Sequence, residues 1–288
     1  MPIAYRKFHL VVAAALMAVS AVSAVRAQDL ATDWVEGFNN KARLIAGKAS
    51  GGPVGAEGAV LAGIEISMGP GFKTYWRNPG EAGGVPPEFD FSGSQNVAGA
   101  RVLYPAPHRT KDKAGENIAY KDTVIFPVLL TPADPAQPMT LNVNAVYGVC
   151  KDICIPAEAS LSISIPPSPE ASDALAAVLK TVPAETANPA TDPVLSSWRI
   201  KREGAKLILI MDVANGGAEG DAFLFSADGL YMPMTKKVSA GAKDVYEADL
   251  TEGASLDELA AKRISVTLVG AKGQSETFIQ LPNDLSGP

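Results

Sequence analysis

The residues with the clearest capacity for chemistry are the chain's 2 cysteines, Cys150 and Cys154, in the stretch YGVCKDICIP. A close cysteine pair can form a structural disulfide, supply ligands to a metal, or exchange its disulfide with other thiols. Each of these chemistries needs a different setting. The elements that hold the pair therefore bear on the choice between them.

The pair is predicted to lie at the end of a β-hairpin. In MTLNVNAVYG every second residue falls on one face of a strand, namely Leu141, Val143, Ala145 and Tyr147. A second strand that begins at Ile155 leaves Lys151-Asp152-Ile153 as the loop. The flanking cysteines then face each other with Cα atoms about 4.5–5.5 Å apart, inside the roughly 4.4–6.8 Å window for a disulfide.

The residues alone leave three roles open for the pair. Closing so short a loop stabilises by only about 2 kcal/mol in the chain-entropy model, so a purely structural disulfide is a weak explanation. Zinc needs about four ligands, but copper(I) could use two thiolates, with Met232 and Met234 in YMPM as possible thioether ligands. Thiol exchange needs an accessible sulfur, and Lys151 favours a thiolate while Asp152 opposes it. Exchange is the favoured interpretation.

Residues 1–27 are typical of a secretory signal peptide. Arg6 and Lys7 precede a run rich in Ala and Val, and Val25-Arg26-Ala27 offers small residues at the cleavage positions. The run is shorter than the ~20 residues that span a bilayer, and an uncleaved anchor is the alternative. We therefore expect an exported protein that does not span the membrane after cleavage, in a compartment where disulfides form.

Charge and histidine content exclude several classes of function. Cleavage after Ala27 removes three basic residues and takes the formal net charge from -6 to -9 (-6 - 3). An acidic chain without basic clusters is a poor ligand for nucleic acid or anionic membranes. Only His108 is left after cleavage, which argues against a Ser-His-Asp hydrolase or a site with several histidine ligands.

The pattern along the chain predicts an all-β protein with two domains. Short alternating strands are expected in residues 28–167 and again in residues 197–288, with a linker at 168–196. In the first region, one face of a strand is formed by Ala62, Ile64, Ile66 and Met68. Pro127 favours an edge strand or a bulge, because proline lacks the amide hydrogen of the ladder.

Two short helices are predicted. Ser168 can cap the first, with Pro169 at its first position and Pro183 as its end. Its apolar stripe is expected to pack against a domain, and consists of Leu175, Val178, Leu179 and Val182. Ser255 and Glu258 have capping-box spacing at the start of the second helix, SLDELAAK.

Several motifs resemble one known family. The segments PGFKTYWRNPGEAGGVPPEFDFSGSQNV, VLYPAPHR, FPV and YGVCKDICIPAEASL resemble the N-terminal periplasmic domain of the DsbD thiol:disulfide interchange proteins. Within that group they most resemble the branch called suppressor of copper sensitivity protein B (ScsB). The likeness runs from about Ala42 to Ile165, and the extra β domain of that branch would cover about 197–282.

The resemblance implies a fold and an activity. It implies immunoglobulin-like β-sandwich domains and a periplasmic thiol:disulfide oxidoreductase without an organic cofactor or metal. Cys154 would form the mixed disulfide with a partner, and Cys150 would resolve it. Electrons would come from a membrane electron-transfer protein of DsbD type and pass to thioredoxin-like periplasmic proteins. The alternative is a copper-handling or binding module whose disulfide is structural.

The sequence departs from the family's pattern in three respects. The CKDIC spacing is shorter than in better-known members, and the stretch PHRTKDKAGENIAY has no aromatic residue before Tyr120 to shield the pair. Other residues are candidates for the environment of the pair, with core packing as the alternative role of the aromatic ones: Phe72, Tyr75, Trp76, Tyr120, Tyr147 and Asp152. The family's membrane and thioredoxin-like domains have no counterpart in these residues, so we expect a stand-alone module reduced by a separate membrane partner.

Overall fold

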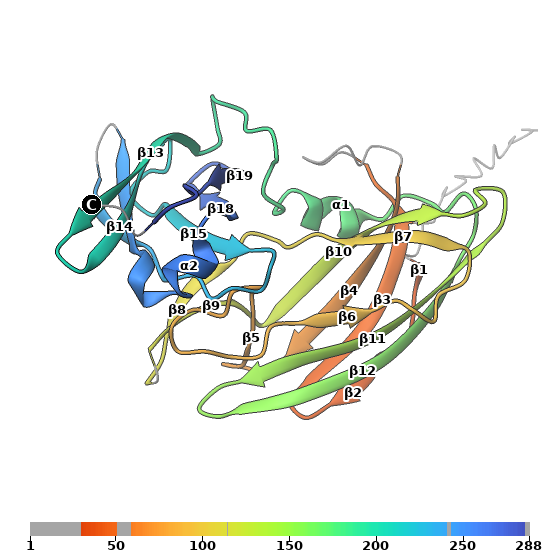
Figure 1. The fold of residues 1–288 in the computed structure, drawn as a ribbon. Helices are drawn as coiled ribbons and strands as arrows, with labels where there is room; N and C mark the ends of the chain where they lie inside the picture. Colours follow the sequence, from red (N-terminus) through yellow and green to blue (C-terminus); the bar gives the residue numbers. More distant parts are fainter. Residues whose placement is uncertain (1–29, 51–58, 114, 241–242, 286–288) are drawn as a thin grey trace, which may run out of the picture.

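The computed structural model describes residues 30–50, 59–113, 115–240 and 243–285. Most of these residues lie in antiparallel strands, which confirms the predicted β class (Figure 1). The predicted signal peptide, residues 1–27, lies outside the described residues. In the described part of the chain, no helix has the length and apolar character to cross a membrane.

In the described part of the chain, the first twelve strands form two six-stranded sheets. One has the order β1-β3-β4-β10-β7, with β2 paired to β3, and the other has the order β12-β11-β5-β9-β8, with β6 paired to β11. The strands are β1 (Leu30–Ala31), β2 (Val35–Gly37), β3 (Asn40–Lys48), β4 (Val60–Met68), β5 (Lys73–Tyr75), β6 (Glu88–Asp90), β7 (Val97–Val102), β8 (His108–Lys111), β9 (Glu116–Lys121), β10 (Thr123–Pro132), β11 (Met139–Cys150) and β12 (Cys154–Ile165).

The two sheets share one apolar core. The alternating residues predicted to face inward are buried in both sheets: Ala62, Ile64, Ile66 and Met68 on β4, and Leu141, Val143, Ala145 and Tyr147 on β11. Burial of alternate side chains fixes the register, because a slip by one residue would turn each strand's apolar face to water. The core thus holds the β11–β12 hairpin and its cysteines in place.

Pro127 lies in a central strand, so the edge-strand interpretation is wrong. β10 pairs with β4 on one side and with β7 on the other. The pairing with β7 begins at Val128, and the carbonyl of Pro127 accepts a hydrogen bond from the amide of Leu103 at 2.7 Å. The missing amide hydrogen of proline is therefore not needed at this position.

The first helix, α1 (Asp173–Leu179), begins later than predicted. Ser172, not Ser168, is its N-cap and accepts a hydrogen bond from the amide of Leu175. The amide of Lys48 donates to the carbonyl of Glu170, which holds the preceding residues in an extended conformation. The predicted packing of the helix is confirmed, since Leu175, Leu179 and Val182 lie in one buried cluster with Ile45 and Leu61.

The remaining strands form a four-stranded sheet, β13-β14-β17-β16, and a three-stranded sheet, β15-β18-β19. We call these seven strands the C-terminal sheets. Ser255 and Glu258 form the predicted capping box of helix α2 (Leu256–Leu259). The strands are β13 (Val194–Glu203), β14 (Lys206–Ala214), β15 (Asp221–Ser226), β16 (Lys236–Ser239), β17 (Asp244–Asp249), β18 (Arg263–Val269) and β19 (Gln274–Gln280), with a 3₁₀ turn at Leu250–Glu252.

The C-terminal sheets lie against the end of the molecule formed by β5, β8 and β9 (Figure 1). Phe223 and Met234 from this part are buried in the same cluster as the core of the first two sheets. The Trp76 ring lies 5.8 Å from the Phe223 ring between centroids. Apolar packing therefore continues from one part of the chain to the other.

Candidate functional site

Cys150 and Cys154 form a disulfide at the end of the β11–β12 hairpin. Cys150 is the last residue of β11, Cys154 is the first of β12, and the two are direct partners in the antiparallel register. The loop Lys151-Asp152-Ile153 is therefore as predicted, and the amide of Lys151 donates to the carbonyl of Ile153. The Cα atoms are 4.1 Å apart, closer than the separation expected from an ordinary strand pair.

The two cysteines differ in exposure. Cys150 is 2% exposed and lies in a small buried cluster with Tyr75 and Ala119. Cys154 is exposed at the start of β12. An incoming thiolate can therefore reach the sulfur of Cys154 more easily than that of Cys150.

The disulfide lines a cleft of about 750 Å³. Part of the lining comes from the segment after β5, with Ala82, Gly83 and Gly84, and part comes from the β8–β9 region, to which that segment is hydrogen-bonded. The remaining lining residues are Tyr75, Asp112, Lys113, Asn117, Lys151, Asp152 and Ile153. The cleft therefore borders the exposed Cys154, while Cys150 stays buried at its edge.

Tyr75 is the aromatic residue beside the disulfide. Its hydroxyl lies 3.9 Å from Cys154 Sγ and can donate a weak hydrogen bond to it. Burial, reinforced by the negative charge of Asp112, raises the pKa of Tyr75 above its usual value, so the phenol keeps its proton. Gly84, with φ +152°, leaves space for the ring, because a Cβ at this position would overlap Tyr75.

A partly buried ion pair lies close to Tyr75. Lys73 is 6% exposed, is the register partner of Cys150, and binds the Asp112 carboxylate with Nζ at 2.5 Å. Asn117 Nδ2 donates to the same carboxylate oxygen at 3.0 Å. The Lys73 ammonium also lies 5.8 Å from the centre of the Tyr75 ring. Sequence reasoning missed Lys73 and Asp112, because nothing in FKTYW or TKDKAG shows that the two side chains meet.

The structure places the remaining candidate residues in different surroundings. Asp152 is exposed and lines the cleft, and the Phe72 ring lies 5.6 Å from Lys151 Nζ at the hairpin loop. Trp76 packs on Phe223 and Phe225 in the core. The hydroxyl of Tyr120 donates to the carbonyl of Pro105, and that of Tyr147 donates to Asn40 Oδ1. Of the candidate aromatic residues, only Tyr75 lines the cleft.

The two methionines of the copper hypothesis lie away from the cleft lining. Met232 is 0% exposed in the core of the C-terminal sheets, and Met234 is 8% exposed in the core shared with the first two sheets. Within the residues that the structure describes, no group of three or more His, Cys, Asp or Glu side chains could hold a metal ion. The methionine sulfurs thus have the surroundings of core residues.

Residues 42–165 match the protein family described as "Thiol:disulfide interchange protein DsbD, N-terminal". This segment carries most of β3, all of β4 to β12, the cleft and both cysteines. Residues 42–165 are a DsbD N-terminal domain. In this DsbD N-terminal domain, three segments surround the two cysteines: the β5 segment, the β8–β9 region and the hairpin loop.

A solved structure resembles more of the chain than the family match covers. The crystal structure of the N-terminal periplasmic domain of ScsB from Proteus mirabilis matches with a TM-score of 0.66 and 20% sequence identity. The match covers 89% of this chain and 100% of that chain, so the likeness in fold extends from the DsbD N-terminal domain into the C-terminal sheets. No curated protein matches the sequence.

Proposed function

We propose that this chain is a periplasmic thiol–disulfide exchange module that acts through Cys150 and Cys154. The observation that carries the proposal is the pairing of a buried cysteine with an exposed one at the edge of an open cleft. The match of residues 42–165 to the DsbD N-terminal family supports it. The activity is that of a protein-disulfide reductase, and the disulfide itself carries the electrons.

The oxidised pair accepts two electrons by two thiolate attacks. A partner thiolate attacks Cys154 Sγ, the Cys150–Cys154 bond breaks, and its electron pair leaves on Cys150 as a thiolate that takes up a proton. The partner's second thiolate then attacks the partner sulfur of the mixed disulfide. This step releases Cys154 as a thiol and the partner as a disulfide. The module is now a dithiol.

The reduced pair delivers its electrons by the reverse steps. Cys154 attacks the disulfide of an exported thiol protein and forms the mixed disulfide, and Cys150 resolves it. Two features of the hairpin suit these roles: Cys154 is exposed beside the Tyr75 hydroxyl, and Ile153, 71% exposed, offers an apolar contact to a docking protein. We propose a membrane electron-transfer protein of DsbD type as the donor and thioredoxin-like proteins as acceptors.

The proposed organisation follows the same family. Residues 1–27 act as a signal peptide, residues 28–167 and 197–288 form immunoglobulin-like sandwich domains, and residues 168–196 link them. The shared apolar cluster around Trp76 and Phe223 supports a fixed arrangement of the two domains.

A trapping experiment tests the assignment of the two cysteines. In a Cys150→Ser variant the mixed disulfide at Cys154 cannot be resolved, so we expect a covalent complex with a thioredoxin-like partner on non-reducing gels. A Cys154→Ser variant is the control, since its remaining thiol, Cys150, is buried. Equal trapping by both variants would contradict the roles assigned to them.

The reduction potential of the pair tests the function itself. Exchange with periplasmic carriers requires a potential near theirs, whereas inert structural disulfides lie below about −300 mV. Equilibration of the purified protein with dithiothreitol redox buffers gives this value. A potential below that limit, together with no trapped partner, would overturn the proposal in favour of a structural disulfide.

A further inference from the structure

Two segments that flank the disulfide also contact the C-terminal sheets. The first wall of the cleft is residues 78–84, of which Ala82, Gly83 and Gly84 line it. The second wall consists of strands β8 and β9 with Asp112 and Lys113. The walls are joined to each other, since the amide of Ile118 donates to the carbonyl of Pro79 at 3.0 Å.

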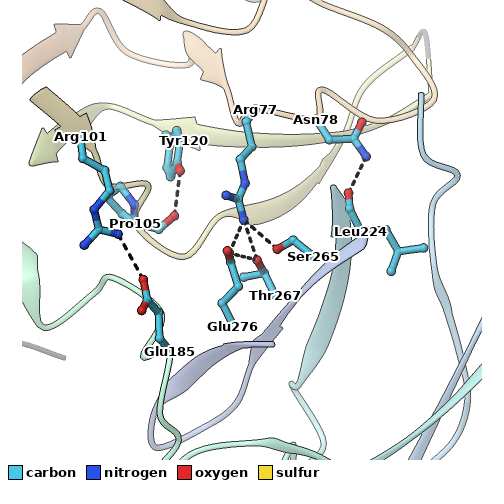
Figure 2. Close-up of polar contacts among 10 residues, drawn as sticks. All are labelled: Arg77, Asn78, Arg101, Pro105, Tyr120, Glu185, Leu224, Ser265, Thr267 and Glu276. Atoms are coloured by element: carbon cyan, nitrogen blue, oxygen red, sulfur yellow. Dashed lines mark hydrogen bonds and ion pairs between the residues drawn. The ribbon is translucent and has the colours of Figure 1, made fainter. Parts of the chain in front are cut away.

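Asn78 fixes the first wall to the C-terminal sheets. Its side-chain amide nitrogen donates to the carbonyl of Leu224 at 3.0 Å and to that of Met232 at 3.2 Å (Figure 2 shows the first). Its side-chain oxygen accepts from the amide of Gly80 at 3.2 Å, inside the wall. Asn78 is 5% exposed, so these bonds form away from water, where loss of a partner is costly.

Arg77, the residue before Asn78, also binds the C-terminal sheets. One guanidinium nitrogen donates to Ser265, to Thr267 and to the carboxylate of Glu276, all on β18 and β19 (Figure 2). The guanidinium also lies 4.3 Å from the centre of the Phe225 ring on β15. Tyr75 and Ala82 both line the cleft. Between them, Arg77 contacts all three strands of the β15-β18-β19 sheet.

Arg109 fixes the second wall. On β8, it forms a two-point contact with Asp221 of β15, with Nε–Oδ2 at 3.0 Å and Nη2–Oδ1 at 2.8 Å. Its other terminal nitrogen donates to Glu116 of β9 at 2.9 Å. A bidentate arginine–carboxylate pair is geometrically specific, so Arg109 sets the position of both wall strands relative to β15.

We propose that the C-terminal sheets position the disulfide site by holding both walls of its cleft, through Asn78 on one side and Arg109 on the other. The inference deepens the proposed function, and rests on it in taking the Cys150–Cys154 bond as the bond that reacts. Asn78 and Arg109 are positioning residues, since neither lines the cleft. The walls restrict access of water to Cys150, on which the leaving thiolate must form.

Reduction by dithiothreitol tests this role in the whole exported chain. Its first thiolate attacks Cys154 Sγ, Cys150 leaves as a thiolate, and its second thiol closes the cyclic disulfide of oxidised dithiothreitol. In Asn78→Ala and in the conservative Asp221→Asn, the walls open more often and water reaches Cys150. We expect reduction about fivefold faster, the factor that corresponds to loss of roughly one net hydrogen bond.

Arg101→Ala is the matched control. It removes an exposed ion pair with Glu185, 3.1 Å long, which joins β7 to the segment before β13 and does not touch either wall (Figure 2). We expect its reduction rate to equal that of the wild type. Hydrogen exchange is measured in parallel, and should accelerate at Ala82 and Ile118 in the two wall variants but not at Ile64 in the core.

Each outcome decides the inference. Unchanged reduction rates in Asn78→Ala and Asp221→Asn would overturn it, and so would an equal rise of hydrogen exchange at Ile64, which indicates global destabilisation. If Asn78→Ala fails to fold, Asp221→Asn still decides, because it changes only a residue of β15. Faster reduction in the variants of a protein that traps no partner would uphold the positioning role and reject the proposed function.

Discussion

At the scale of single residues, the site depends on the difference between two sulfurs. Cys150 is enclosed with Tyr75 and Ala119, while Cys154 is open to solvent beside the Tyr75 hydroxyl. The phenol stays protonated well into the alkaline range because its pKa is raised, first by burial and then by Asp112. Tyr75 is therefore a hydrogen-bond donor throughout the pH range in which an ordinary thiol ionises.

Replacing Tyr75 by Phe tests this donor. In the reduced protein the hydroxyl can stabilise a thiolate on Cys154, and the ring without its hydroxyl still fills the space beside Gly84. We expect Tyr75→Phe to slow alkylation of Cys154 by iodoacetamide at neutral pH by about two- to fivefold, as loss of one weak hydrogen bond predicts. Alkylation at the wild-type rate across the pH profile would show that the hydroxyl does not act on the sulfur.

At the scale of elements, the β11–β12 hairpin is tied to the opposite sheet by Tyr147. This side chain is 1% exposed, and its hydroxyl donates to Asn40 Oδ1 of β3 at 2.7 Å. Burial raises the pKa of Tyr147 to about 12 from 10.0. Above pH 10 the unfolded chain therefore loses this proton while the folded chain keeps it, and stability falls as pH rises toward 12.

Tyr147→Phe should make the fold less sensitive to alkali. Between pH 8 and pH 11 we expect the wild type to lose about 1 kcal/mol more free energy of unfolding than the variant. The loss arises between pH 10 and pH 11, where the unfolded chain gives up the Tyr147 proton and the folded chain keeps it. Urea unfolding at the two pH values measures this difference. The variant is less stable than the wild type at pH 8 by about 1 kcal/mol, since it lacks the bond to Asn40. An equal loss in both proteins would contradict the linkage.

Much of the hairpin could be predicted from the sequence, because its signals are local. The alternation of Leu141, Val143, Ala145 and Tyr147, followed by two cysteines around a three-residue loop, predicts the strand, its inner face and its end. Local signals did not predict where α1 begins, because the residues before Ser172 are hydrogen-bonded to Lys48, which is distant in the sequence. Spacing gave no sign of that contact.

At the scale of the whole molecule, the contacts that shape the site are distant in sequence. Asn78 and Leu224 are 146 residues apart, and Arg109 and Asp221 are 112 apart. Asn78 and Arg109 lie in segments that resemble the family, but no pattern in the sequence pairs them with Leu224 and Asp221. The sequence could therefore predict the cysteines but not the contacts that position their cleft. The C-terminal sheets, in which the sequence shows no catalytic motif, are thus in direct contact with the segments that line the site.

The shared core predicts that both parts of the chain unfold together. Phe223 of β15 is 2% exposed and packs on Trp76 in the cluster that also contains the β4 and β11 side chains. Phe223→Ala should cost about 3–5 kcal/mol, the range for large-to-small changes in a core. We expect amide exchange in urea to report one midpoint for β4 and β18 in the wild type, and a lower common midpoint in the variant.

Phe278→Ala is the size-matched control for this experiment. Phe278 is 45% exposed on β19 and stacks on Arg263, so its loss should change stability by no more than about 0.5 kcal/mol. If β18 lost protection at lower urea than β4, and Phe223→Ala shifted only β18, the two parts would be independent folding units. A common midpoint means instead that damage to the C-terminal sheets reaches the disulfide site through the core as well as through the cleft walls.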